Sequence, residues 1–288
     1  DTEMVFERPG STAEVTAPAP DEEAETDTVA DSQTETEIED NWTVVPLASA
    51  QELVPYSCTE FSMDIPEGWT VQSAPMYTGM CHAVRVYDPE HPVNQVFYML
   101  KIEPLFADEN TRAGFALYAA WMEQCPVLTN VSTEGVFEVL PQIGMFMTAT
   151  GDYADNQVPS MENFSVTERF ESQSYTSSVA IAPAVLRAAF TQDGEEGEGM
   201  MTADVVPFAM GTGAGYYSVY NLTVISAEKD TFQDWQPTLS KSLSSLTYTQ
   251  EFQSFATSQS NQAAATAQSL SQTASEMSDS ILSSWENR

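Results

Sequence analysis

The sequence predicts a mixed α+β domain that follows a long acidic leader and precedes a tail helix. Phe, Tyr and Trp are concentrated between about residues 44 and 255. This middle part holds short runs of alternating apolar and polar residues, separated by Gly, Pro, Asp and Asn, and it holds segments with apolar residues at helical spacing. We therefore expect a leader over residues 1–45, one domain over residues 46–250 and a helical tail over residues 251–288.

The leader is acidic and has no hydrophobic period. The first 40 residues contain 14 of the 43 acidic residues and only Arg8 as a base. Such a segment cannot bury enough apolar surface to offset the entropy of ordering, so we expect it to be disordered. Its Thr, Glu, Ala and Pro content is typical of a spacer that holds a domain away from a membrane or a wall.

The charge of the whole chain excludes one class of partner. The formal net charge is −34, with 9 bases against 43 acids, and such a field repels a phosphate backbone. We therefore expect no nucleic-acid partner. The sequence has neither a stretch of about 20 apolar residues nor a signal-peptide pattern, so we expect no transmembrane segment. An extracellular or cell-surface location and salt adaptation both fit this charge.

Strand-like runs account for most of the middle part. Residues 61–65 alternate and lead into a turn at Pro66–Trp69, and residues 82–87 and 95–103 predict a hairpin joined by a segment with two prolines. We expect further strands over residues 135–140, 144–150, 165–171, 201–206 and 216–225.

Apolar residues at offsets of three and four predict helices. We expect helices over residues 111–124, 180–190 and 230–246, the last one closing the domain. After Phe255 a weak apolar seam continues to Trp285 and predicts a tail helix. The seam is too small and polar for a strong coiled coil, so this helix is expected either to pack loosely on the domain, to self-associate or to dock on a partner.

Two short motifs resemble a known family. The segment from Tyr56 to Trp69, with its F-S-M-D-I-P-E-G-W core, and the segment from Phe232 to Leu246 resemble the start and the end of a PsbP/Mog1-like domain. This resemblance implies an antiparallel sheet sandwiched by helices, and a binding or assembly role with no catalytic residue to transfer. The tail over residues 269–288 also resembles the C-terminal segment of surface lipoproteins of Gram-positive anaerobes. That likeness implies a bacterial surface protein with a lipid or wall tether upstream.

No catalytic, metal or cofactor motif is recognisable. His82 and His91 are the only histidines, and neither stands in a nucleophile-base pattern. The glycines of residues 211–215 precede a strand-like run where a phosphate loop would open a helix, so they predict a turn. The acidic run over residues 193–199 lacks the ligand order of an EF-hand loop and predicts a solvated hairpin tip. We therefore assign no catalytic residue, no metal ligand and no cofactor.

The candidate binding residues are three tyrosines. Tyr216, Tyr217 and Tyr220 cluster on one predicted strand, and their rings suit stacking on a sugar or lining a small-molecule pocket. Ordinary packing on the sheet is the alternative explanation for this cluster.

The cysteines allow two interpretations. Cys58, Cys81 and Cys125 lack metal-site spacing, and they form either one disulfide with a spare thiol or three separate buried thiols. If the first strand and the helix before Cys125 end at the same side of the sheet, Cys58 and Cys125 meet. We therefore predict a disulfide between Cys58 and Cys125.

These observations favour a non-catalytic extracellular binding or interaction domain for an unknown protein or small-molecule ligand. A hydrolase that uses two scattered carboxylates, and a structural spacer or assembly subunit, are the alternatives. The interaction domain predicts an exposed apolar patch, whereas the hydrolase predicts a deep cleft that holds two carboxylates.

Overall fold

The computed structural model describes residues 51–74, 82–150, 157–174, 176–210, 214–259 and residue 277. The chain divides into two units, residues 1–45 and 46–288, and all of the described residues belong to the second. The predicted disordered leader and most of the predicted tail helix therefore lie outside the described residues. The described part has the predicted mixed α+β composition, with helices and antiparallel sheets.

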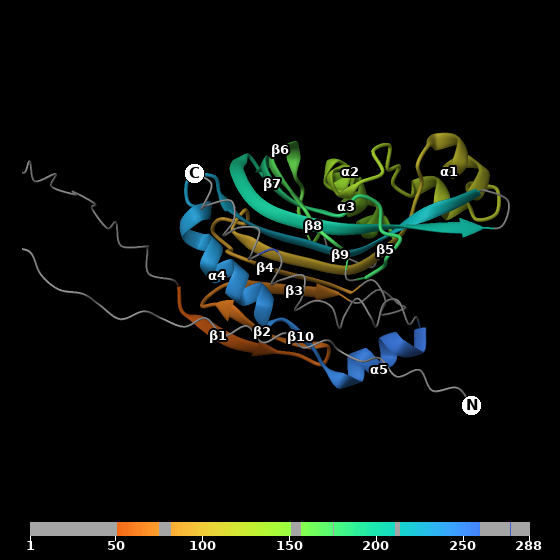
Figure 1. Cartoon of the computed structure of the whole chain (residues 1–288). Coiled ribbons are helices and arrows are strands. Elements are labelled where there is room, and N and C mark those ends of the chain that lie inside the picture. The colour runs from red at the N-terminus through yellow and green to blue at the C-terminus, as the bar shows by residue number, and fades with distance from the viewer. Residues whose placement is uncertain are drawn as a thin grey trace, which may run out of the picture. The chain divides into compact units, whose positions relative to one another are not determined.

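Two antiparallel sheets form the body of the described part (Figure 1). The predicted strand over residues 61–65 and the predicted hairpin over residues 82–87 and 95–103 are confirmed. The smaller sheet has the order β1-β2-β10, with β1 (Leu53–Ser57), β2 (Phe61–Pro66) and β10 (Thr247–Tyr248). The larger sheet has the order β3-β4-β5-β9-β8-β7-β6, with β3 (Thr70–Ala74), β4 (Ala83–Tyr87), β5 (Gln95–Leu105), β6 (Glu162–Glu171), β7 (Ala184–Gln192), β8 (Glu195–Met210) and β9 (Ala214–Glu228).

Helices lie between and after the strands. The predicted helix over residues 230–246 is confirmed as α4, while the one predicted over residues 111–124 is divided into α1 and the 3₁₀-helix η1. No helix in the described ranges combines the length and the apolar character that crossing a lipid bilayer requires. The helices are α1 (Glu109–Ala116), η1 (Ala120–Gln124), α2 (Thr133–Glu138), α3 (Leu140–Ala149), α4 (Phe232–Ser245) and α5 (Gln250–Gln259).

The larger sheet separates two hydrophobic cores. On β5, Phe97 and Met99 belong to the first core, whereas Tyr98 and Leu100 belong to the second. Because neighbouring side chains of a strand point to opposite faces, the two cores lie on opposite sides of the sheet. The first core contains side chains of α2 and α3, and the second contains side chains of α4, α5 and the smaller sheet (Figure 1).

The structure corrects two predicted strands to helices. Residues 135–140 and 144–150 fall in α2 and α3. The Ser132 hydroxyl accepts a hydrogen bond from Gly135 N at 3.2 Å and so caps α2. The apolar residues Val136, Leu140, Ile143 and Met147 recur at offsets of three and four, and all are buried in the first core. The helical period therefore outweighs the β-branched and aromatic content of this segment.

The structure also corrects the predicted helix over residues 180–190, because residues 184–190 belong to β7. Asp193 and Gly194 have positive φ angles of 52° and 89° and connect the paired residues Gln192 and Glu195. A two-residue loop of this kind favours a hairpin because its twist matches that of the flanking strands. Only these two residues form the predicted tip, since Glu195–Gly199 already belong to β8.

His82 is buried among aromatic rings of the second core. Its side chain is 0% exposed, and its Nδ1 lies 3.0 Å from the hydroxyl of Tyr248. The rings of Phe61, Tyr248 and Phe252 meet the imidazole edge-on. Its Nε2 is buried without a hydrogen-bond partner in the described part of the chain. Burial lowers the pKa of His82 to about 4, so the imidazole is neutral at neutral pH.

We predict that His82 makes stability depend on pH. Its pKa is lower in the folded chain than in the unfolded one, so the unfolded state binds the proton more readily. The stability contributed by neutral His82 is complete above about pH 6.5 and is lost as the pH falls toward 4, by about 3 kcal/mol. Urea unfolding at pH 7 and pH 4 should show this component in the wild type and in His91→Gln. It should be missing in His82→Phe; an equal pH dependence in that variant would contradict the prediction.

We also predict that Gly199 tolerates no side chain. A Cβ at this position would lie 2.5 Å from the Ile225 carbonyl oxygen, a backbone atom of the neighbouring strand that cannot move aside cheaply. Gly199→Ala should lower the free energy of unfolding by about 1–3 kcal/mol. Gly114→Ala is the control because a Cβ there meets no atom within 4 Å, and in a helix it should be neutral or stabilising. Equal effects of the two changes would contradict this packing.

Candidate functional site

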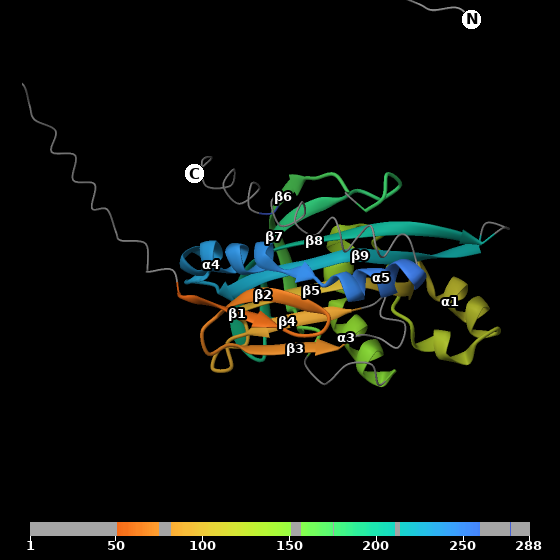
Figure 2. The same ribbon diagram turned by 90° about the horizontal axis from the view of Figure 1, so that it is seen from below.

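Strands β8 and β9 continue past their neighbours at one end of the larger sheet. The pairing of β7 with β8 ends at Thr202, and that of β5 with β9 ends at Tyr217. Beyond these points β8 and β9 pair with each other as far as Met210 and Ala214. The result is a projecting two-stranded arm, residues 206–210 and 214–217, which is seen in Figures 1 and 2 extending past the sheet.

A groove of about 1210 Å³ lies between this arm and the segment that contains α1 and η1. The arm contributes Pro207, Phe208, Tyr216 and Tyr217, and the helical segment contributes residues 107–122 in part. The predicted glycine turn over residues 211–215 is described only in part. Its residues 211–213 lie outside the described residues, and the strand predicted after it is confirmed as β9.

Aromatic rings form the floor of the groove. The rings of Phe208 and Tyr216 stack with centroids 4.9 Å apart and an interplanar angle of 20°. Phe115 meets Tyr216 edge-on at 6.5 Å, and it also contacts Phe106 in the first core at 5.1 Å. These ring contacts connect the lining of the groove to the first core, because each contact restricts the rotamers of both rings.

The helical wall of the groove is held by few contacts. No residue of α1 or η1 is fully buried. The wall is attached through Phe115 and Met122, which pack partly against the first core, and through Trp121, whose ring stacks on Phe146 of that core with centroids 6.4 Å apart. The guanidinium of Arg112 also donates to the Cys125 carbonyl oxygen at 3.1 Å.

The rim of the groove exposes large apolar side chains. Tyr118 is 90% exposed, Leu117 is 87% exposed and Phe208 is 50% exposed. The sequence assigned residues 111–124 to one amphipathic helix, in which Leu117 and Tyr118 belonged to the buried stripe. Helix α1 instead ends at Ala116, and these side chains face solvent. The sequence contains no signal for this change.

Asp108 is the charged side chain among the described residues that line the groove. Its Oδ1 accepts a hydrogen bond from Thr111 N, and its Oδ2 accepts one from the Thr111 hydroxyl, both at 2.8 Å. The backbone hydrogen bond from Thr111 is the main cause that lowers the pKa of Asp108. This carboxylate therefore caps α1 in its ionised form.

The structure brings two of the three predicted tyrosines into the groove. Tyr216 and Tyr217 line it, and burial raises the pKa of Tyr216, which keeps its phenol neutral. Tyr220 is not among the lining residues. Its ring is only 6% exposed and lies over the ammonium of Lys101, with 5.5 Å between Nζ and the ring centroid.

A bulge on β9 explains the different environment of Tyr220. Asn221 has a left-handed backbone with φ 57°. Between Thr202 and Asp204 of β8 the register shifts, so that β9 contains one additional residue. Leu222 and Val219, three positions apart, consequently both face the first core. A sequence-based alternation cannot anticipate such a reversal.

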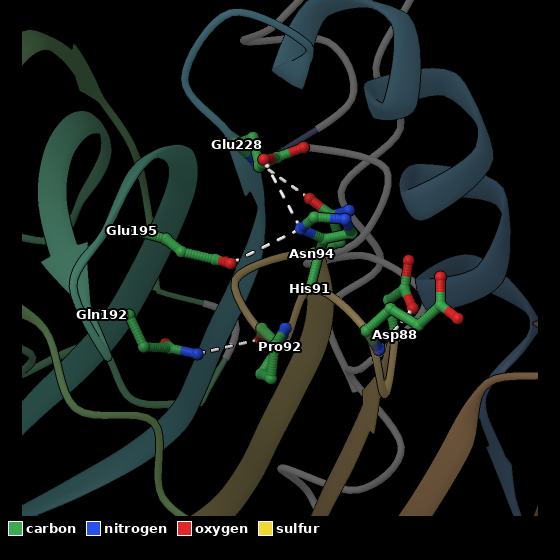
Figure 3. Close-up of polar contacts among 8 residues, drawn as sticks. Asp88, His91, Pro92, Asn94, Gln192, Glu195 and Glu228 are labelled. Atoms are coloured by element: carbon green, nitrogen blue, oxygen red, sulfur yellow. Dashed lines mark hydrogen bonds and ion pairs between the residues drawn. The ribbon is translucent and has the colours of Figure 1, made fainter.

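The exposed histidine, His91, precedes the end of β5 that is opposite to the groove, and Figure 3 shows its contacts. His91 Nδ1 is 3.4 Å from Glu195 Oε1 and 3.5 Å from Glu228 Oε1, and the His91 side chain is 46% exposed. The backbone N–H of Glu228 donates to the Asn94 side-chain oxygen at 2.9 Å, which ties the loop before β5 to the end of β9. These contacts give His91 a structural role in joining strand ends.

The predicted disulfide is wrong, since Cys58 and Cys125 are free thiols. Cys125 is buried in the first core, and Cys58 packs against the second, so the larger sheet separates them. The prediction failed because it assumed that the two segments end on one side of the sheet. Cys58 Sγ lies 3.3 Å from Glu60 Oε2, to which it donates. The third cysteine, Cys81, lies outside the described residues.

Within the described ranges, no group of three or more His, Cys, Asp or Glu side chains is placed to hold a metal ion. Neither a protein-family model nor a curated protein sequence matches this chain. The groove therefore has to be interpreted from its own geometry and chemistry.

We predict that the two thiols react very differently with a maleimide. Cys58 is half-buried, whereas Cys125 is buried and its thiol pKa is raised to about 12 by burial. Native protein should be labelled at Cys58, and Cys125 should react only after unfolding. Peptide mapping without reductant checks this. A peptide pair crosslinked through Cys58 and Cys125 would contradict the structure.

Proposed function

We propose that this chain is a non-catalytic binding or interaction domain and that the groove beside the β8–β9 arm is its binding surface. The observation that carries the proposal is the exposure of Leu117 and Tyr118 beside the stacked rings of Phe208 and Tyr216, of which Phe208 is itself half exposed. Large apolar side chains that are exposed together around a groove are typical of interaction sites and ligand grooves. Covering each of these side chains would contribute about 1.5–3 kcal/mol.

The composition of the groove favours binding over hydrolysis. A carboxylate-based hydrolase requires two carboxyl groups about 5 to 10 Å apart across a cleft. The described lining of the groove contains the single carboxylate of Asp108, and both of its oxygens already accept hydrogen bonds from Thr111. An acid that serves as a helix cap and has a lowered pKa is poorly suited to donate a proton.

The finer assignment of the fold is part of this proposal. A PsbP/Mog1-like domain is supported by the antiparallel sheet with α2 and α3 on one face and α4 on the other. A location at a bacterial cell surface is supported by the acidic composition of residues 1–45. Both features suit a domain that is presented to a partner by an extended spacer.

We predict that the groove binds a neutral apolar dye. Nile red should fluoresce on the wild-type protein, and Phe208→Ser or Leu117→Ser should reduce the bound fraction by about half or more, because each change removes apolar surface from the rim. Phe255→Ser is the matched control, since Phe255 is 43% exposed but lies on α5, which belongs to the second core. Loss of the signal in Phe255→Ser with no change in Phe208→Ser would place the apolar site elsewhere and overturn the proposal.

A further inference from the structure

We infer that the ligand of this groove is a basic polypeptide segment with apolar anchor side chains. The inference rests on the proposed function and adds to it the chemical class of the partner. Three properties of the described residues carry it: the sign of the charge around the groove, the faces of its aromatic rings and the open edge of the arm.

The charge at the groove is negative and, among the described residues, lacks a local counter-ion. Asp108 lines the groove, and two cationic side chains of the adjoining elements β5 and α1 are already engaged. Arg112 forms an ion pair with Glu109, and Lys101 forms one with Glu103 while only 5% exposed. A ligand with a negative charge therefore meets no cation in this described lining, whereas a Lys or Arg meets the ionised carboxylate of Asp108, which no cationic side chain of the lining neutralises.

The same imbalance extends over the molecule. The chain has a formal net charge of −34. Most of the basic residues in the described ranges form ion pairs within the chain: Lys101, Arg112, Arg169, Arg187 and Lys229. The electric field of such a negatively charged protein steers cations toward the surface and raises their association rate. Salt screens this field, with a Debye length of about 8 Å at physiological ionic strength.

Aromatic faces add a local attraction for cations. The groove and its rim present Phe208, Tyr118, Tyr216 and Tyr217, and a Lys or Arg head group over such a ring gains about 0.5–1 kcal/mol at an exposed site. The molecule already uses this contact elsewhere. The guanidinium of Arg85 lies 4.6 Å from the ring centroid of Tyr87, and Lys101 lies over Tyr220.

The groove suits a polypeptide better than an oligosaccharide. Leu117 is the second most exposed large apolar residue of the rim, and a branched aliphatic side chain offers no flat face for a sugar ring. Residues 207–209 of β8 line the groove and, in the described part, pair with a strand on one side only, that of β9. The other edge of β8 leaves backbone groups for an extended segment to pair with, except at Pro207, which has no N–H.

The test uses short fluorescein-labelled peptides and fluorescence anisotropy on the full chain. The first peptide alternates Lys with Leu and Phe, the second replaces every Lys by Glu, and the third keeps Lys but replaces the apolar residues by Ser. We expect the first to bind at least about 10-fold more tightly than either of the others at low salt. Raising the salt concentration should reduce the ratio between the affinities of the first peptide and of the Glu peptide.

Variants locate the binding site. Tyr118→Ala and Phe208→Ser should each weaken binding of the first peptide by about 10-fold, as expected for anchor contacts. Phe255→Ser should leave it unchanged. Equal binding by all variants would mean attraction to the acidic surface in general and would overturn the inference.

The remaining outcomes separate this inference from the proposed function. If Nile red binds in the groove but the Lys peptide binds no better than the Glu peptide, the groove is a binding surface and the inference fails. The inference also fails if neutral oligosaccharides bind in the groove and the peptides do not. If neither the dye nor any peptide depends on Phe208, the proposed function fails as well.

Discussion

Strand β5 is buried on both of its faces, and the rest of the described structure depends on this. Phe97, Tyr98, Met99 and Leu100 are all 0% exposed, although successive side chains enter different cores. A strand of this kind is stable only if each face of the sheet is covered, so α2 and α3 must cover one face and α4 with the smaller sheet the other. The burial of each of these side chains contributes about 1.5–3 kcal/mol to stability.

This constraint also determines where a binding surface can form. Both faces of the larger sheet are covered along β5, so ligand contacts near this strand are confined to the ends of the sheet. At one end, the His91 side chain contacts the carboxylates of Glu195 and Glu228 and so connects the loop before β5 with β8 and β9. At the other end, β8 and β9 extend past the neighbouring strands. They are flanked there by α1 and η1, in which no residue is fully buried. The groove with its exposed rings is the consequence.

Sequence patterns predicted the parts of this structure that depend on local signals. The hairpin of β4 and β5 was predicted because two strand-like runs flank a connection with two prolines, and α4 was predicted because its apolar residues recur at offsets of three and four. Val136 and Phe137 were assigned to a strand because short apolar runs suit either structure. Tyr216 and Tyr217 were found as binding candidates, but Leu117, Tyr118 and Phe208 were not. Their exposure depends on where α1 ends and on how far β8 extends, and neither is a local property.

The central claim is that the arm of β8 and β9, together with α1 and η1, forms the surface that meets a ligand. Hydrogen exchange with mass spectrometry, with and without the Lys peptide, tests this claim most directly. Our account predicts slower exchange for amides within residues 107–122 and 206–217, and unchanged exchange in β6 and α3. Protection confined to α4 and α5, or spread evenly over the acidic surface, would contradict it.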